Sequence, residues 1–394
     1  MTAQDRGPDR AYDLLALGRV GVDLYPLQHG VTLDEVSTFE KFLGGSAANV
    51  TVAAARHGRS SALISATADD AFGRFVHRQL LQLGVDDAHV ATITGGPPTP
   101  VTFCEVMPPD HFPIWFYRYP TAPDLMLSVD SLPRQAIRDA RIYWSTLTGL
   151  SREPSRAAHL AAWEERGRRV PSVLDLDYRP GFWDDPLEAR AQVARGLREV
   201  TIAIGTVEEC ELATGESDPD AAARSLLASG IDLAVVKQGP RGVLGVTATE
   251  RVQVDAFPVT VVNALGAGDA LGGALVHGLL EGWDLERALH FANVAGAIVA
   301  SRAECSAAMP TTSEVQQMLS DVEVADGTWL AWGMLVTLAA YLPILLAVRS
   351  LGPSESPSHD VAVLWGAFTG FMVIRAVVLG WRARHDDWMV VGAR

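Results

Sequence analysis

Positive charge is scarce in this chain, and lysine is almost missing. The 394 residues include 32 Lys or Arg against 47 Asp or Glu, so the formal net charge is −15. Lysine occurs only as Lys41 and Lys237. A protein that binds nucleic acid normally carries charge of the opposite sign. The composition therefore predicts no nucleic-acid partner.

Cysteine is also rare, and the N-terminus lacks an apolar segment. Cys104, Cys210 and Cys305 stand far apart and do not have the spacing of a metal site. This favours buried free thiols over a disulfide or a catalytic thiol. Residues 1–10 mix charges and do not resemble a signal peptide. We therefore expect a cytoplasmic protein.

Long hydrophobic runs are absent from most of the chain and gather near its C-terminus. Mean hydropathy is +0.14, and the 20 residues Trp329–Val348 carry no charge. Such a run is as long as a bilayer core is thick. We expect a folded acidic domain over 1–320, a linker over 321–328 and two hydrophobic helices over 329–394.

The second hydrophobic run, Val361–Trp381, contains Arg375, which is costly in lipid unless it reaches the surface. Arg382 and Arg384 follow it, as at the cytoplasmic end of a membrane helix. One interpretation is a hairpin that contacts the membrane through 329–381 and anchors a cytoplasmic domain. The alternative is a pair of buried helices in a soluble protein.

Within 1–320, short apolar runs alternate with helical patterns, which predicts an α/β fold with a parallel sheet covered on both faces. Two segments rich in β-branched and aromatic residues, 99–107 and 113–119, interrupt this order. They predict a pair of antiparallel strands that could form a small lid. Strands are expected near 12–18, 61–65, 142–146, 173–176, 201–204 and 233–237, and helices near 46–57, 72–83, 155–168, 187–198, 220–228, 267–281, 285–302 and 313–319.

The segment from Val261 to Asp269 has the strongest chemical pattern. We expect a strand that runs into Gly266-Ala267-Gly268, followed by Asp269 on the first turn of a helix. Glycines and a helix N-terminus bring backbone N–H groups together around an anion. Asp269 is placed to take a proton from a hydroxyl beside that anion, or else to cap its helix.

Two further glycine-rich segments flank the predicted sheet. Residues 44–51 begin with Gly44-Gly45, open a helix and include Asn49. Their small side chains allow either tight packing of that helix or close approach of its backbone to a ligand. Residues 237–242 form a plain hairpin turn or contact a nucleotide.

Together, residues 44–51 and 266–269 resemble the two signatures of the ribokinase-like (PfkB) carbohydrate kinases, with 237–242 fitting the family's nucleotide loop. The resemblance covers about 11–320. It implies a three-layer sandwich with a mostly parallel sheet and a β lid. It also implies ATP and Mg²⁺ as cofactors, and it leaves open a monovalent cation and a homo-oligomer.

The resemblance also implies a role for individual residues. Asp269 is the expected base, and the expected anion hole for the transferred phosphoryl group is Gly266, Ala267 and Gly268. The expected substrate-binding residues are Asp23, Gly44, Gly45, Asn49, Phe116, Arg118 and Arg179. The expected ATP-binding residues are Thr206, Lys237, Gly239, Gly242 and Asn293. Glu209 is expected to act on Mg²⁺ through water. Thr206 stands where the family commonly has Asn, and its shorter side chain reaches less far toward the phosphates.

Residues 112–120 and 175–183 are similar to segments of the family's 5-dehydro-2-deoxygluconokinases, which act in inositol catabolism. This implies phosphorylation of 5-dehydro-2-deoxy-D-gluconate at its 6-hydroxyl. A guanidinium matches a carboxylate bidentately, which suits Arg118 and Arg179 to a sugar acid. The alternative for each is a pair with a local aspartate.

Other interpretations stay open. The chain could be a 2-keto-3-deoxygluconate kinase or another PfkB sugar kinase, or a membrane-tethered protein that binds sugar without turnover. Residues 327–394 resemble the last two helices of multidrug and toxin extrusion (MATE) family transporters. Two helices cannot form a transport pathway, so we expect a fusion or an artefactual join.

Overall fold

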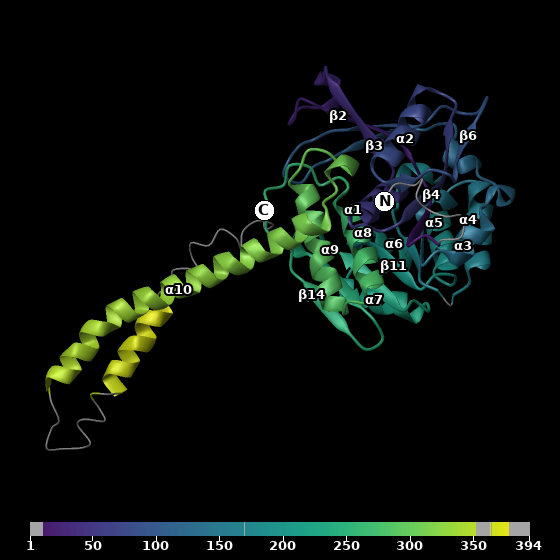
Figure 1. Ribbon diagram of the computed structural model, residues 1–394. Coiled ribbons are helices and arrows are strands. Elements are labelled where there is room, and N and C mark those ends of the chain that lie inside the picture. Colours follow the sequence, from purple (N-terminus) through teal and green to yellow (C-terminus); the bar gives the residue numbers. More distant parts are fainter. Residues whose placement is uncertain (1–10, 169, 352–362, 364, 378–394) are drawn as a thin grey trace. The chain divides into compact units, whose positions relative to one another are not determined.

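The computed structural model describes residues 11–168, 170–351, 363 and 365–377 (Figure 1). The chain divides into two compact units, Met1–Val315 and Gln316–Arg394. The first unit contains every residue to which the sequence assigns a chemical role.

The first unit is built on a ten-stranded sheet. Its central strands are buried along their whole length, as in parallel sheets that are covered on both faces. The pairs from β4 through β1, β9, β10 and β11 to β12 are parallel, whereas β13 and β14 are antiparallel. The strands are β1 (Leu14–Leu17), β4 (Ser61–Ala68), β5 (Val85–Asp86), β6 (Val90–Ile93), β9 (Ile142–Thr146), β10 (Ser172–Asp175), β11 (Ile202–Thr206), β12 (Leu233–Lys237), β13 (Val243–Val246) and β14 (Arg251–Val254).

Helices cover both faces of this sheet, as the alternating pattern predicts. The neighbours Tyr143 and Trp144 on β9 point to opposite faces, because successive side chains on a strand alternate. Tyr143 belongs to the same hydrophobic cluster as Trp163, whereas Trp144 meets the α8 backbone at Gly272. The helices are α1 (Ser46–Arg56), α2 (Ala71–Gln82), α3 (Arg134–Asp139), α4 (Ser155–Arg166), α5 (Pro186–Gly196), α6 (Val207–Thr214), α7 (Pro219–Ala228), α8 (Ala267–Glu281) and α9 (Leu285–Ala300).

A smaller sheet has the strand order β3-β2-β7-β8, with β2 (Gly21–Pro26), β3 (Phe39–Gly44), β7 (Val101–Cys104) and β8 (Ile114–Tyr117). The antiparallel pairing of β7 with β8 confirms the prediction made from 99–119. The sequence analysis did not identify β2 and β3. β2 contains Asp23 although the strand is almost wholly buried, and the half-exposed β3 contains Glu40 and Lys41, so neither strand has a clear apolar pattern.

One predicted strand is wrong. Val261–Leu265 is irregular, although α8 begins and ends as expected. The amides of Val262 and Asn263 donate to Ala300 O at the end of α9, and they do not join a sheet. An apolar pair next to a glycine turn gives the same short pattern as a strand.

The second unit begins within α10 (Thr312–Leu351), and Tyr341 packs against Phe371 at 5.1 Å between ring centroids. The predicted linker over 321–328 is wrong, since α10 continues through it. The stretch contains no proline, and most of its residues are compatible with a helix. Among the described residues, no helix is long and apolar enough to cross a membrane. The membrane hairpin predicted over 329–381 thus has no support, and part of Val361–Trp381 lies outside the described residues.

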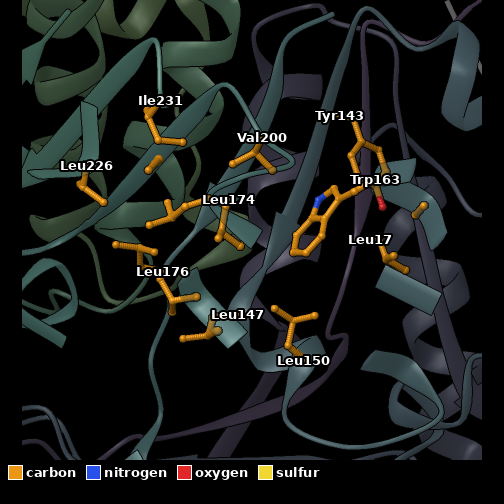
Figure 2. Packing of buried hydrophobic residues seen from close by; sticks show 14 of the residues in the cluster. Leu17, Tyr143, Leu147, Leu150, Trp163, Leu174, Leu176, Val200, Leu226 and Ile231 are labelled. Carbon is orange, nitrogen blue, oxygen red and sulfur yellow. The ribbon is translucent and has the colours of Figure 1, made fainter. Parts of the chain in front are cut away.

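Trp163 of α4 belongs to the hydrophobic cluster between the helices and the sheet and lies beside Tyr143 (Figure 2). Its side chain is fully buried, and its indole N–H donates to Ser145 Oγ at 3.0 Å. Leu17, Tyr143 and Leu174 belong to the same cluster. The face of the sheet under α4 therefore depends on one large side chain.

We expect Trp163→Ala to lower the free energy of unfolding by about 3–5 kcal/mol, because it leaves a cavity and removes the hydrogen bond to Ser145 Oγ. Urea unfolding followed by circular dichroism measures this change. Leu187→Ala on α5 is the control, since Leu187 is 70% exposed and should change stability by less than about 0.5 kcal/mol. Equal effects of the two substitutions would contradict the packing described.

Candidate active site

Polar side chains gather where the parallel strands end. Arg19 follows β1, Asp175 ends β10 with Asp177 just beyond it, and Lys237 ends β12. These strands are parallel and lie in one sheet, so their carboxyl ends share one edge. Open α/β sheets bind ligands at that edge. The sequence analysis gave no role to Arg19, Asp175 or Asp177, because no glycine-rich motif marks them.

Asp269 and Asn49 join the two glycine-rich elements. Asn49 Nδ2, on α1, donates to Asp269 Oδ2 at 2.7 Å and contacts Cys305 Sγ at 3.2 Å. Burial raises the pKa of Asp269 to about 6, and the hydrogen bond from Asn49 opposes this rise. A carboxylate with a pKa near 6 is ionised at neutral pH and still basic enough to accept a proton.

Gly266 forms the entry to α8. Its φ is +83°, and a Cβ there would lie 2.1 Å from Cys305 Sγ. Only glycine fits both the left-handed conformation and this close contact. The turn leaves the first amides of α8, which follow Gly266, at an open helix N-terminus beside Asp269. Such a terminus binds anions.

Asp23 on β2 packs against Gly44. A Cβ on Gly44 would lie 2.0 Å from Asp23 Oδ1, so glycine is required beside this carboxylate. Gly45 has φ +108°, and its own Cβ would lie 2.3 Å from the carbonyl oxygen of Arg19. Burial raises the pKa of Asp23, and its Oδ1 has no hydrogen-bond partner. Asp23, Gly44 and Gly45 thus lie together with Arg19, although no motif includes that arginine.

Lys237 lies among carboxylates. Its Nζ is 3.6 Å from Asp175 Oδ1 and 3.9 Å from Glu209 Oε2. A Cβ on Gly268 would be 3.4 Å from this ammonium, so Lys237 borders the open end of α8. Burial raises the pKa of Asp175 to about 7, with Lys237 opposing the rise. Burial alone would lower the pKa of Lys237, but the facing carboxylates, Asp175 first, raise it.

Thr206 and Glu209 form a capping box at the start of α6. Glu209 N donates to Thr206 Oγ1 at 3.2 Å, and Thr206 N donates to Glu209 Oε2 at 2.7 Å. Glu209 Oε2 therefore accepts from the Thr206 amide while it also lies 3.9 Å from Lys237 Nζ.

The remaining residues expected at the nucleotide site lie around β13 and β14. Asn293 Nδ2 on α9 donates to Asp255 O at 2.8 Å. A Cβ on Gly242 would lie 2.0 Å from Val254 O. Gly242 and Asn293 thus contact the same segment, 254–256. Gly239 has φ +55° and has open space on its Cβ side.

Two of the arginines expected to bind substrate have carboxylate partners in this structure. Arg118 Nη2 donates to Asp124 Oδ2 at 2.9 Å, and both side chains are buried. Arg179 Nε donates to Asp177 Oδ1 at 2.8 Å, and Ser46 Oγ donates to the other oxygen of Asp177 at 2.6 Å. For both arginines the structure has the local pair that the sequence left as the alternative.

Phe116 and Arg179 line one cavity of about 420 Å³, which lies between β8 and the loop after β10. Phe116 packs edge-on against Phe182 with centroids 4.8 Å apart. A volume of this size is in the range of small-molecule sites. The cavity is lined by Phe112, Ile114, Trp115, Phe116, Tyr119, Arg179, Pro180, Gly181 and Phe182.

No group of three or more His, Cys, Asp or Glu side chains among the described residues could hold a metal ion by itself. Asp175 and Glu209 nevertheless offer carboxylate oxygens beside the open end of α8. Mg²⁺ usually keeps several waters and takes one or two carboxylates plus phosphate oxygens. These two residues fit that pattern of coordination.

An anion-binding helix terminus beside a buried carboxylate is the arrangement of an enzyme that transfers a phosphoryl group to a hydroxyl. Residues 12–312 match the family described as pfkB family carbohydrate kinase. The chain belongs to this family of carbohydrate kinases. The matched residues end before the C-terminal tail, so the resemblance of that tail to a transporter has no support from them.

Curated relatives cover nearly all of this match. The chain is 32% identical over 320 residues to the 5-dehydro-2-deoxygluconokinase of Halalkalibacterium halodurans, which spans 80% of this chain and 96% of the relative. It is 31% identical over 316 residues to the enzyme of the same name from Bacillus subtilis, covering 79% of this chain and 97% of the relative.

Solved structures define the fold as ribokinase-like. A putative ribokinase II from E. coli, in its apo form, aligns with a TM-score of 0.73 and 22% identity over 79% of this chain and all of that chain. A fructokinase from Vibrio cholerae with fructose, ADP and calcium aligns with a TM-score of 0.68 and 25% identity, over 78% of this chain and 98% of that one.

The raised pKa of Asp269 predicts how activity depends on pH. A carboxylate must be ionised to accept a proton, so with Asp269 as the expected base kcat/KM should fall about tenfold per pH unit below pH 6. Asn49→Leu removes the hydrogen bond that lowers this pKa, so it should move the acidic limb to higher pH.

Steady-state kinetics between pH 4.5 and 8.5 measures the limb. Asn293→Leu is the matched control, because Asn293 contacts Asp255 O and should leave the midpoint of the limb in place. An acidic limb that Asn49→Leu does not move would show that another group limits the reaction.

Proposed function

We propose that this protein transfers the γ-phosphoryl group of ATP to the 6-hydroxyl of 5-dehydro-2-deoxy-D-gluconate. The observation that carries the proposal is the hydrogen bond between Asn49 and Asp269 at the open N-terminus of α8. It holds one buried carboxylate where a hydroxyl and an anion can meet. The curated relatives named 5-dehydro-2-deoxygluconokinase support this choice of acceptor.

The charges in the site favour a sugar acid over a neutral sugar. Arg179 lines the cavity, and Arg19 lies over the ring of Phe116, which lines it too. Arginine pairs with carboxylates through two parallel hydrogen bonds. Asp23, Gly45 and Asn49 are suited to the hydroxyls of the same substrate, and Phe116 to its carbon chain.

The nucleotide would lie along the edge from β12 to β14. The amides after Gly266 provide donors for the transferred group, and Lys237 provides a cation beside them. Asp175 and Glu209 are the carboxylates available to Mg²⁺, whose role is to neutralise charge on the phosphates. Gly242 and Asn293 shape segment 254–256, where we place the base or ribose.

Catalysis by these residues rests on positioning and charge stabilisation. Asp269 accepts the proton of the substrate hydroxyl as that oxygen bonds to phosphorus and the bond from phosphorus to the leaving oxygen breaks. Asn49 holds Asp269 in place through 2.7 Å. The α8 terminus stabilises the charge that builds up on the transferred group.

Asp269→Asn should remove the base and keep the volume of the side chain. We expect kcat to fall by about 10²–10⁴. Binding of the sugar acid, followed by isothermal titration calorimetry, should stay within about threefold of that of the unchanged protein. Equal turnover by the two proteins would contradict the role of Asp269, and loss of binding would mean that the substitution disturbs the whole site.

A panel of purified acceptors tests the substrate. We expect the full chain with ATP and Mg²⁺ to turn over 5-dehydro-2-deoxy-D-gluconate with the highest kcat/KM, ahead of 2-keto-3-deoxygluconate, fructose and ribose. A higher kcat/KM for 2-keto-3-deoxygluconate would assign the protein to that substrate. Binding of the acid without any turnover would favour a non-catalytic sugar-binding protein.

A further inference from the structure

Arg179 lines the cavity, and Arg19 and Arg118 lie over the rings of Phe116 and Phe182, which line it too. Only two of these three arginines have an anionic partner. Arg118 is paired with Asp124, and Arg179 with Asp177. Arg19 forms no ion pair with any carboxylate that the structure describes, and its Nε has no hydrogen-bond partner. The guanidinium is nevertheless almost fully buried, with 8% of the residue exposed.

A buried cation without a partner is costly, and proteins normally pair it or neutralise it. Burial lowers the pKa of Arg19, and the carboxylates of Asp177 and Asp23 raise it from a distance. An arginine remains charged even so. The charge therefore lacks a contacting anion, and a ligand could supply one.

Local packing holds this guanidinium in place. Arg19 lies in the turn between β1 and β2, where the Gly45 backbone approaches its carbonyl oxygen. Its guanidinium carbon is 5.1 Å from the centroid of the Phe116 ring. Phe116 lines the cavity together with Arg179. The unpaired charge therefore lies against a ring that lines the cavity.

Arg19 and Asp269 belong to different parts of the site. Asp177 and Arg179 act electrostatically on both of them, but neither Arg19 nor Asp269 is among the main influences on the other. The Asp177–Arg179 pair is therefore near both groups. A substrate that gives its hydroxyl to Asp269 and reaches Arg19 would pass close to this pair.

We propose that Arg19 binds the carboxylate of the sugar acid and sets the preference for acids over neutral sugars. The inference rests on the proposed function and adds to it a residue that recognises the end of the substrate remote from the transferred group. Arg118 and Arg179, already paired, hold the walls of the pocket: Arg118 stacks 4.7 Å from Phe182, and Arg179 fixes Asp177.

The experiment compares 5-dehydro-2-deoxy-D-gluconate with its C1 amide, which has the same shape but no charge. For the full chain with ATP and Mg²⁺, kcat/KM should be about 100-fold higher with the acid, because a buried ion pair forms only there. Arg19→Met should lower kcat/KM for the acid by about 100-fold, mainly through KM. It should change kcat/KM for the amide less than about threefold.

Two further variants separate recognition from structure. Arg19→Lys keeps the charge and should retain part of the preference for the acid. Arg118→Met removes an arginine that is already paired, so it should lower kcat/KM for acid and amide by the same factor and leave their ratio unchanged. Thermal unfolding of each variant shows whether the fold is intact.

The results distinguish the inference from the function on which it rests. Equal losses for acid and amide in Arg19→Met, or no loss for either, would overturn the role of Arg19 and leave the kinase activity standing. A preference for another sugar acid that disappears in Arg19→Met would support Arg19 and refute the proposed substrate. No turnover of any acid by the unchanged chain would refute both.

Discussion

The hydrogen bond from Asn49 to Asp269 is the contact on which the rest of the site depends. It connects the first turns of two helices, α1 and α8, that are more than 200 residues apart in the sequence. Close packing of the helices makes this contact possible, because Gly273 on α8 leaves no room for a Cβ against Ala53. The position of Asp269, the proposed base, is thus fixed by helix packing and not by its own loop.

Most buried charges in the site lie next to a charge of the opposite sign. Lys237 faces Asp175 and Glu209, and Arg179 faces Asp177. Each pair keeps a buried charge tolerable, since an isolated one would be neutralised or expelled. Buried polar atoms without a hydrogen-bond partner, such as Arg19 Nε and Asp23 Oδ1, then stand out as those available to a ligand.

Most of the parallel sheet and its helices could be predicted from sequence, because buried strands and glycine-bounded helices have strong local patterns. β9, β12 and α8 have the predicted bounds. β2 and β3 could not be predicted in this way, since β2 buries the charged Asp23 and the half-exposed β3 contains Glu40 and Lys41. Arg19 was missed for a related reason: its chemistry comes from its burial and lack of a partner, which only tertiary structure defines.

The contact between Asp23 and Gly44 also constrains how this sequence can change over time. A Cβ at position 44 would overlap the Asp23 carboxylate at 2.0 Å, so a larger residue at 44 is acceptable only after position 23 has become smaller. The reverse order of substitution is open, because shortening Asp23 creates space. Residues 23 and 44 should therefore vary together among relatives. In a lineage that loses the Asp23 carboxylate, the substitution at 23 should precede the one at 44.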